Sequence, residues 1–171
     1  MNKSNNFLQK IKNFNLPTCL RICAGTDGSV TFLLEIMTLH EVVVDTESQF
    51  IVKADAEKAA IFGIEVGDEL NCRNVKLISN GIPYVYAKSY APIDIMPKEM
   101  KEDLMNANIP IGKILRNYDM ETRRDFLNVG ILKQSCFGCE SVIYRDYVII
   151  HNEKIIMWIN EKFPIDDRWN L

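Results

Sequence analysis

Histidine is scarce in this sequence, since the chain of 171 residues contains only two, His40 and His151, in unrelated segments. This argues against a histidine-based metal site and against a triad that uses a histidine base. The phosphate-binding glycine loop and the GxGxxG, GxSxG and HExxH motifs are also absent, which excludes the standard signatures of nucleotide-binding proteins, hydrolases and zinc proteases. Any catalysis is expected to use carboxylate and guanidinium groups, with no cofactor and no metal.

Long apolar runs are missing as well. The longest, 59–64 and 155–159, are far shorter than the ~20 residues that a membrane-spanning helix requires, and residues 1–14 lack the apolar centre of a signal peptide. The formal net charge of −3 does not supply the basic field that nucleic-acid binding needs. We expect a cytoplasmic protein whose partner is a small-molecule substrate, not a membrane or a nucleic acid. The sequence carries no indication of the oligomeric state.

The five cysteines form an odd set, which is not typical of a secreted domain held together by disulfides. Cys19 and Cys23 form one close pair, and Cys136 and Cys139 form another. The two pairs could offer four thiolates to zinc or form a regulatory disulfide, although they lie far apart and lack a zinc-ribbon context. The simpler interpretation is that they are reduced, small, buried hydrophobic residues.

The length and the hydrophobic content of 47% suit one domain over residues 1–171, large enough to enclose a cavity. Apolar spacing predicts helices over 7–14, 29–37, 97–107 and 110–117, with Ser29 as the cap of the second. Strand patterns occur over 40–54, where a polar break at 45–48 indicates two strands, and over 70–78, 82–91, 122–131, 141–150 and 154–163.

Short turns between these strands decide the fold class. Asn80 and Gly81 favour a tight hairpin between the strands that flank them. Strands that follow one another through short turns form antiparallel pairs. We therefore predict an α+β fold, with a single antiparallel sheet, helices covering one face and an enclosed ligand cavity.

Glu161 is a carboxylate on an otherwise apolar strand face. Because side chains alternate along a strand, it shares its face with Ile155, Met157, Ile159 and Phe163. Burying an unpartnered carboxylate is costly, so Glu161 is a candidate general acid. A strand end that twists into solvent, or an ion pair with an arginine across the sheet, would also explain the pattern.

Arg73 repeats this pattern in the first strand of the predicted hairpin. It shares strand parity with Val75 and Leu77, and its planar guanidinium could bind a carboxylate. The opposite face, with Leu70 and Cys72, is equally apolar, so parity leaves the buried face of this strand undecided.

Three further arginines fall on predicted strands. Arg123 and Arg124 point to opposite faces of one strand, so at least one of them faces the sheet interior or its covering helices. Arg145 has apolar neighbours on its face, although an ordinary cross-strand pair beside Asp146 explains it as well.

Four segments that match in order carry a resemblance to a known family. The first is 33–38 and the second is 71–75. The third is 109–115, taken together with Arg124, Asp125, Phe126 and Gly130. The fourth is 159–164. Together they resemble the chorismate pyruvate-lyases, which eliminate pyruvate from chorismate and leave 4-hydroxybenzoate. The match spans roughly residues 33–164, and the shared order of the segments is more specific than any one of them.

The resemblance implies roles for five residues. Arg73 would bind the ring carboxylate of chorismate or a close relative. Met37 and Ile111 would pack on the ring, and Gly112 would lie in the same cavity-lining segment. Glu161 would act at the ring oxygens, as an acid that protonates the departing enolpyruvyl group or as an acceptor that holds the hydroxyl. No cofactor is required.

Two other classes of function stay open. The effector-binding domains of GntR-type regulators are similar to this fold, so the chain could bind an aromatic carboxylate without catalysis. Only about thirty residues precede the matched region, too few for a winged-helix module. The third possibility is a structural or oligomerisation protein, in which Arg73 and Glu161 merely neutralise each other.

Overall fold

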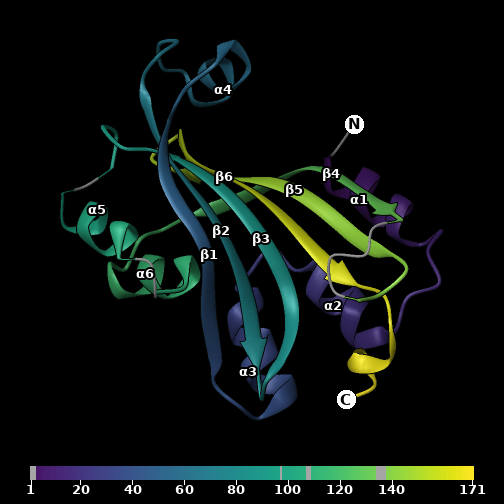
Figure 1. The fold of residues 1–171 in the computed structure, drawn as a ribbon. Helices are drawn as coiled ribbons and strands as arrows, with labels where there is room; N and C mark the ends of the chain where they lie inside the picture. Colours follow the sequence, from purple (N-terminus) through teal and green to yellow (C-terminus); the bar gives the residue numbers. More distant parts are fainter. Residues whose placement is uncertain (1–2, 97, 107–108, 134–137) are drawn as a thin grey trace.

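The computed structural model describes residues 3–96, 98–106, 109–133 and 138–171, and an antiparallel sheet forms its centre (Figure 1). The sheet has six strands in the order β1-β2-β3-β6-β5-β4. The strands are β1 (Val42–Lys53), β2 (Glu69–Ser79), β3 (Ile82–Pro92), β4 (Arg123–Leu132), β5 (Val142–His151) and β6 (Lys154–Pro164). The helices of the described part are α1 (Lys3–Ile11), α2 (Thr18–Gly25), α3 (Val30–Thr38), α4 (Ala56–Phe62), α5 (Lys98–Met105), α6 (Ile111–Asn117) and the short 3-10 helix η1 (Asp167–Trp169). The predicted α+β class with one antiparallel sheet is confirmed.

Two hairpins form the middle of the sheet. Asn80 and Gly81 join β2 to β3 with φ angles of 49° and 76°, the left-handed values that a tight turn needs, so the predicted hairpin is confirmed. Asn152 and Glu153 join β5 to β6 with φ angles of 47° and 63°. Because β3 also pairs with β6, the two hairpins lie side by side.

Strand β1 is continuous, whereas the polar break at 45–48 predicted two strands. The ladder between β1 and β2 shifts register between Thr46 and Ser48, which is a bulge that absorbs one extra residue. The polar segment therefore stays within the strand.

Helix caps are present both at a predicted helix and at one that the apolar spacing missed. Ser29 caps α3 as expected, because its Oγ accepts a hydrogen bond of 3.3 Å from the backbone N–H of Phe32. The apolar spacing predicts neither α2 nor α4. Helix α4 nevertheless carries cap signals at both ends. The Asp55 side chain accepts a hydrogen bond from the backbone N–H of Lys58, and Gly63 follows the helix with a φ of 65°.

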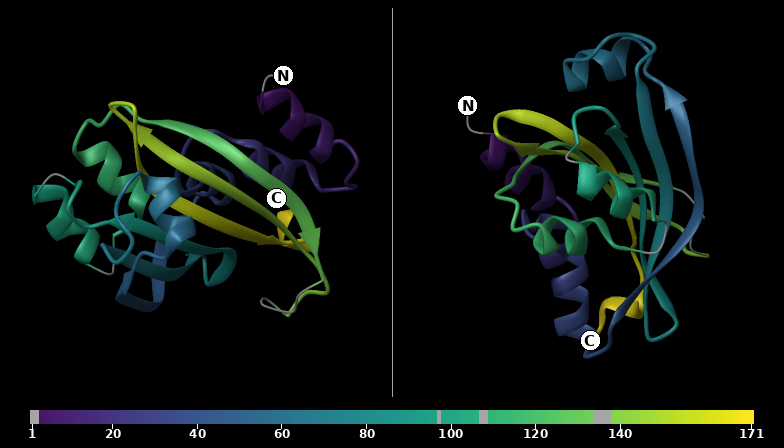
Figure 2. Two further views of the ribbon diagram at one scale, coloured as in Figure 1. Left: turned by 90° about the horizontal axis from the view of Figure 1, so that it is seen from above. Right: turned by 90° about the vertical axis from the view of Figure 1, so that its left-hand side faces the viewer.

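The prediction that helices cover one face is confirmed for all described α-helices except α4 (Figure 2). Helix α4 packs through Ala59 and Phe62 against Leu70, Tyr90 and Trp158. Along their strands, these three residues alternate with the residues under the other helices, so they point to the opposite face. Strand β2 is therefore buried on both faces, by α4 at Leu70 and by the other helices at Val75 and Leu77, which explains why parity could not decide the face of Arg73.

Two hydrophobic clusters fill the space between the sheet and its helices. One joins α1, α2 and α3 to the sheet and includes Leu20, Leu34 and Phe163. The other joins α5 and α6 to β5 and β6 and includes Met100 and Met157. Within the described ranges, no helix is long and apolar enough to cross a membrane.

Candidate functional site

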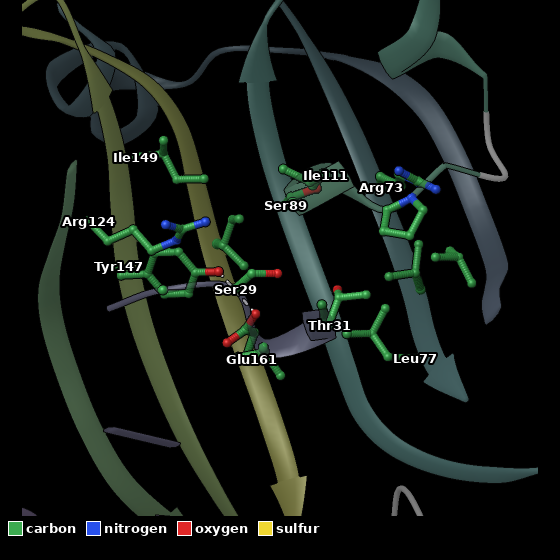
Figure 3. A pocket seen from close by; sticks show the side chains of 18 residues that line it. Ser29, Thr31, Arg73, Leu77, Ser89, Ile111, Arg124, Tyr147, Ile149 and Glu161 are labelled. Carbon is green, nitrogen blue, oxygen red and sulfur yellow. Dashed lines mark hydrogen bonds between the residues drawn. The ribbon is translucent and has the colours of Figure 1, made fainter. Parts of the chain in front are cut away.

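A pocket opens between the two clusters, over the middle of the sheet (Figure 3). It is lined by Gly28, Ser29, Val30, Thr31, Val44, Arg73, Val75, Leu77, Ala87, Ser89, Pro110, Ile111, Gly112, Arg124, Tyr147, Ile149, Ile159 and Glu161. Its volume is about 60 Å³, room for several water molecules, which restricts it to a small ligand. Four of the five predicted site residues line it, and most of its wall is apolar.

The strand register brings distant parts of the chain into one row across the pocket floor. Arg73 on β2 pairs with Ser89 on β3, Ser89 with Ile159 on β6, and Ile159 with Tyr147 on β5. Neighbouring strands are ~4.8 Å apart, so the backbones of Arg73 and Tyr147 are separated by roughly 14 Å. Glu161 lies on β6, two residues beyond Ile159 and on the same face.

Arg73 is almost completely buried, with 2% of its surface exposed. Its Nη1 donates to the carbonyl oxygen of Ile109 at 2.9 Å, and its Nη2 donates to Thr46 Oγ1 at 3.4 Å. Burial lowers the pKa of the guanidinium to about 10, so Arg73 is still cationic at neutral pH. The pocket therefore contains a fixed, desolvated positive charge, which suits a carboxylate ligand.

Glu161 is buried, and both of its carboxylate oxygens have partners. Nε and Nη2 of Arg145 each lie 2.7 Å from Glu161 Oε2, and Tyr147 Oη donates to Oε1 at 3.0 Å. Arg145 is fully buried, and its Nη1 also donates to the carbonyl oxygens of Ala24 and Thr26. The ion pair across the sheet, one of the interpretations left open above, is therefore present, and Glu161 also faces the pocket.

Tyr147 lines the pocket from β5, beside Glu161, to which its hydroxyl donates. Burial, reinforced by the negative charge of Glu161, raises the pKa of Tyr147 well above its ordinary value. The phenol therefore stays protonated and acts as a hydrogen-bond donor. One signal for Tyr147 is visible in the sequence, because it shares strand parity with Arg145.

The two adjacent arginines of β4 point to opposite sides, as predicted. Arg123 is exposed and forms a 2.9 Å ion pair with Asp125. Arg124 turns toward the helices and lines the pocket, and its Nη1 donates to the carbonyl oxygen of Asp27 at 3.1 Å. The pocket thus contains a second arginine, on the side opposite to Arg73 (Figure 3).

The first turns of α3 and α6 meet over the pocket. A Cβ atom added at Gly112 would lie 3.0 Å from Ser29 Oγ, closer than a side chain comfortably allows. Glycine at this position therefore lets the two helix ends approach each other. Ile111 lines the pocket beside it.

The Gly112→Ala variant tests this close approach. We expect it to lower the free energy of unfolding by about 1 kcal/mol relative to Gly25→Ala, because the new methyl group displaces the Ser29 side chain that caps α3. Gly25 is the control because a Cβ atom there would meet nothing within 4 Å. Urea unfolding measures both variants, and equal midpoints would contradict the expectation.

Met37 is not among the residues that line this pocket, and its role as a ring-packing residue stays a prediction. It lies in the last turn of α3 and packs, half-buried, against the first hydrophobic cluster. The pocket is at the opposite end of this helix, where Val30 and Thr31 line it. Seven residues of helix span ~10 Å, which is the distance along α3 between Met37 and the lining residue Val30.

The described cysteines are free thiols, Cys19, Cys23, Cys72 and Cys139. Burial raises the pKa of Cys23 to about 12, so this thiol is neutral beside the Arg145 pair. Cys136 lies outside the described residues, and the alternative of a zinc site or a disulfide that includes Cys136 therefore stays open. In the described part of the chain, no cluster of His, Cys, Asp or Glu side chains is suited to hold a metal ion.

Solved structures define the class of this fold. The effector domain of PhnF from Mycobacterium smegmatis superposes with a TM-score of 0.65 at 12% identity, over 80% of this chain and 88% of that chain. The ligand-binding domain of a GntR-family regulator from Bordetella bronchiseptica gives a TM-score of 0.60 at 15% identity, over 73% and 86% of the two chains. The fold is therefore that of the effector domains of GntR-type regulators.

Sequence comparison defines the family more narrowly. The chain belongs to the Rv2949c-like chorismate pyruvate-lyase family, whose model matches residues 25–170. It is 36% identical to "Putative lyase MJ0807" of Methanocaldococcus jannaschii, over 90% of this chain and 82% of that protein. It is 28% identical to a chorismate pyruvate-lyase of Mycobacterium leprae, over 69% of this chain and 57% of that protein.

Proposed function

We propose that this protein eliminates pyruvate from chorismate to form 4-hydroxybenzoate without a cofactor. One observation carries the proposal: Arg73 and Glu161 face the same buried pocket from strands β2 and β6, which β3 separates. Glu161 takes its ion-pair partner, Arg145, from the neighbouring strand β5. Membership of the lyase family supports the same activity.

Arg73 is the group that we assign to the ring carboxylate. Its guanidinium is buried and charged, and a carboxylate can accept two parallel hydrogen bonds from such a fork. The dry surroundings strengthen this interaction relative to water. The apolar side chains of Val75 and Ile111 then flank the ring.

The elimination needs no redox partner. The bond between the ring carbon and the enolpyruvyl oxygen breaks, and its electron pair leaves with the oxygen. The ring carbon that bears the hydroxyl loses its hydrogen as a proton, and the C–H electron pair completes the aromatic ring. The enolpyruvate takes up a proton at its methylene carbon and becomes pyruvate.

Glu161 acts, in our proposal, as an acceptor for the ring hydroxyl. Arg145 and Tyr147 already donate to its two oxygens, and this pattern suits an ionised carboxylate. Such a group orients the hydroxyl and stabilises positive charge on the ring as the enolpyruvyl group departs. The alternative role, in which Glu161 itself protonates the departing group, is less compatible with these two donors.

Incubation of the purified protein with chorismate tests the function. We expect 4-hydroxybenzoate and pyruvate to appear in equal amounts. Chromatography measures the 4-hydroxybenzoate, and a coupled enzymatic assay measures the pyruvate. No added metal should be needed, so turnover is expected to persist in excess chelator. Absence of both products under these conditions would contradict the proposal.

Binding without catalysis is the second candidate, because the fold is shared with effector domains of regulators. It predicts that 4-hydroxybenzoate binds tightly while chorismate is not converted. Calorimetric titration with 4-hydroxybenzoate, run beside the turnover assay, separates the two candidates.

A further inference from the structure

We infer that Arg124 binds a second carboxylate, so that the pocket selects a small dicarboxylate whose two acidic groups lie between Arg73 and Arg124. The inference deepens the proposed function and rests on it for the first carboxylate. Chorismate is a dicarboxylate, and the assignment of Arg73 to the ring carboxylate leaves the acidic group of the enolpyruvyl arm without a binding residue.

The charged groups of the pocket favour a ligand with two acidic groups. Among the described residues that line it, the charged side chains are Arg73, Arg124 and Glu161. The negative charge of Glu161 is matched by Arg145, directly behind it. Arg73 and Arg124 are therefore the two guanidinium groups that the lining presents to a ligand beside this neutral pair, and a ligand with two carboxylates complements them.

The hydrogen bonds of Arg124 leave one of its donors available to a ligand. Its Nη1 donates to a neutral acceptor, the carbonyl oxygen of Asp27. Its Nε is buried and has no hydrogen-bond acceptor within the described residues. A buried donor without an acceptor costs free energy, and a ligand oxygen at this position would remove that cost.

Arg73 and Arg124 approach the pocket from opposite sides of the sheet. Arg124 lies on β4 and Arg73 on β2, so four strand spacings, roughly 19 Å, separate their backbones. Both side chains extend inward from opposite sides of the pocket (Figure 3). The space between the two guanidinium groups is therefore limited to a ligand about one substituted ring in length, with Tyr147 and Glu161 along its path.

Binding of two matched probes tests the inference without any turnover. The dicarboxylate 3-(carboxymethoxy)benzoate and the monocarboxylate 3-methoxybenzoate share a ring, an ether and one carboxylate, and differ in the second carboxylate. We expect the wild-type protein to bind the dicarboxylate about 10- to 100-fold more tightly in calorimetry, the range of a charge-assisted hydrogen bond. Arg124→Gln should abolish this preference and leave the affinity for 3-methoxybenzoate within about threefold.

Arg123→Gln is the matched control, because Arg123 is adjacent in sequence, exposed and turned away from the pocket. It should keep the full preference. Arg124→Lys keeps the positive charge and loses the planar fork, so it should retain part of the preference for the dicarboxylate. It also provides a test of the site if Arg124→Gln fails to fold. An Arg124→Gln protein that still prefers the dicarboxylate, or that loses both probes equally, would overturn the inference.

The lyase proposal and this inference fail separately. If wild-type protein converts chorismate and Arg124→Gln does so with unchanged KM, the dicarboxylate site is wrong while the lyase stands. If chorismate is not converted but the dicarboxylate preference depends on Arg124, the lyase is wrong while the second subsite stands.

Discussion

Glu161→Gln is expected to reduce the turnover number for chorismate by about 100- to 1000-fold, the range for the loss of one preorganised electrostatic group that stabilises the transition state. Glutamine keeps the shape and one hydrogen-bond acceptor, but it removes the negative charge that faces the ring hydroxyl. The affinity for 4-hydroxybenzoate should fall much less, because Arg73 still holds the ring carboxylate. Steady-state kinetics and calorimetric titration measure the two quantities.

The substitution also leaves Arg145 as a buried charge without its carboxylate, so stability has to be measured beside activity. Arg145 keeps its hydrogen bonds to the carbonyl oxygens of Ala24 and Thr26, and the assays should therefore run well below the unfolding midpoint. Cys139→Ala, a truncation of a buried side chain outside the pocket lining, is the control for general destabilisation. If it lost as much activity as Glu161→Gln, the catalytic assignment of Glu161 would be wrong.

Strand parity was sufficient to single out Glu161. The alternation along β6 places Met157, Ile159, Glu161 and Phe163 on one face, and the structure buries all four on the pocket side. The alternation of side chains along one strand does not depend on the other strands, so it can be predicted from a single sequence. The same holds for Ser29, whose cap interaction is local and fixes the start of α3 next to the pocket.

The partner of Glu161 could not be read from the hairpin turn. An unbroken ladder that starts from the observed pair of His151 and Lys154 would align Glu161 with Tyr144. A register shift between Ile149 and Ile150 moves the ladder by one residue, and Glu161 then faces Arg145. A bulge of this kind depends on tertiary packing, and the sequence showed no Gly or Pro to indicate it.

The position of Met37 relative to the pocket could not be predicted for a different reason. The matched segment at 33–38 lies at the correct place in the chain, but it says nothing about which end of its helix approaches the sheet centre. In the structure, Val30 and Thr31 at the first turn line the pocket. The direction of α3 over the sheet is a tertiary feature, and a single sequence does not carry it.

Arg145→Met is expected to lower the free energy of unfolding by about 3–5 kcal/mol, the usual cost of removing one partner from a buried ion pair. The variant leaves Glu161 buried with only Tyr147 as a donor, and it removes the hydrogen bonds to Ala24 and Thr26 that tie α2 to the sheet. The exposed pair of Arg123 and Asp125 is the matched comparison, so Arg123→Met should cost no more than about 0.5 kcal/mol.

The double variant Arg145→Met/Glu161→Gln shows whether the buried charge is the cause. Once Glu161 is replaced by a neutral residue, no unpaired carboxylate is left in the core, so the double variant should be more stable than Arg145→Met alone. Urea unfolding of the two single variants and the double variant gives the coupling free energy between the two positions. A double variant less stable than Arg145→Met would mean that the contacts of Arg145 with α2, rather than its pairing with Glu161, hold this part of the fold together. Recovery of stability without recovery of turnover would instead separate the two roles of the pair, because Arg145 supports Glu161 in the fold while the Glu161 charge is what the reaction needs.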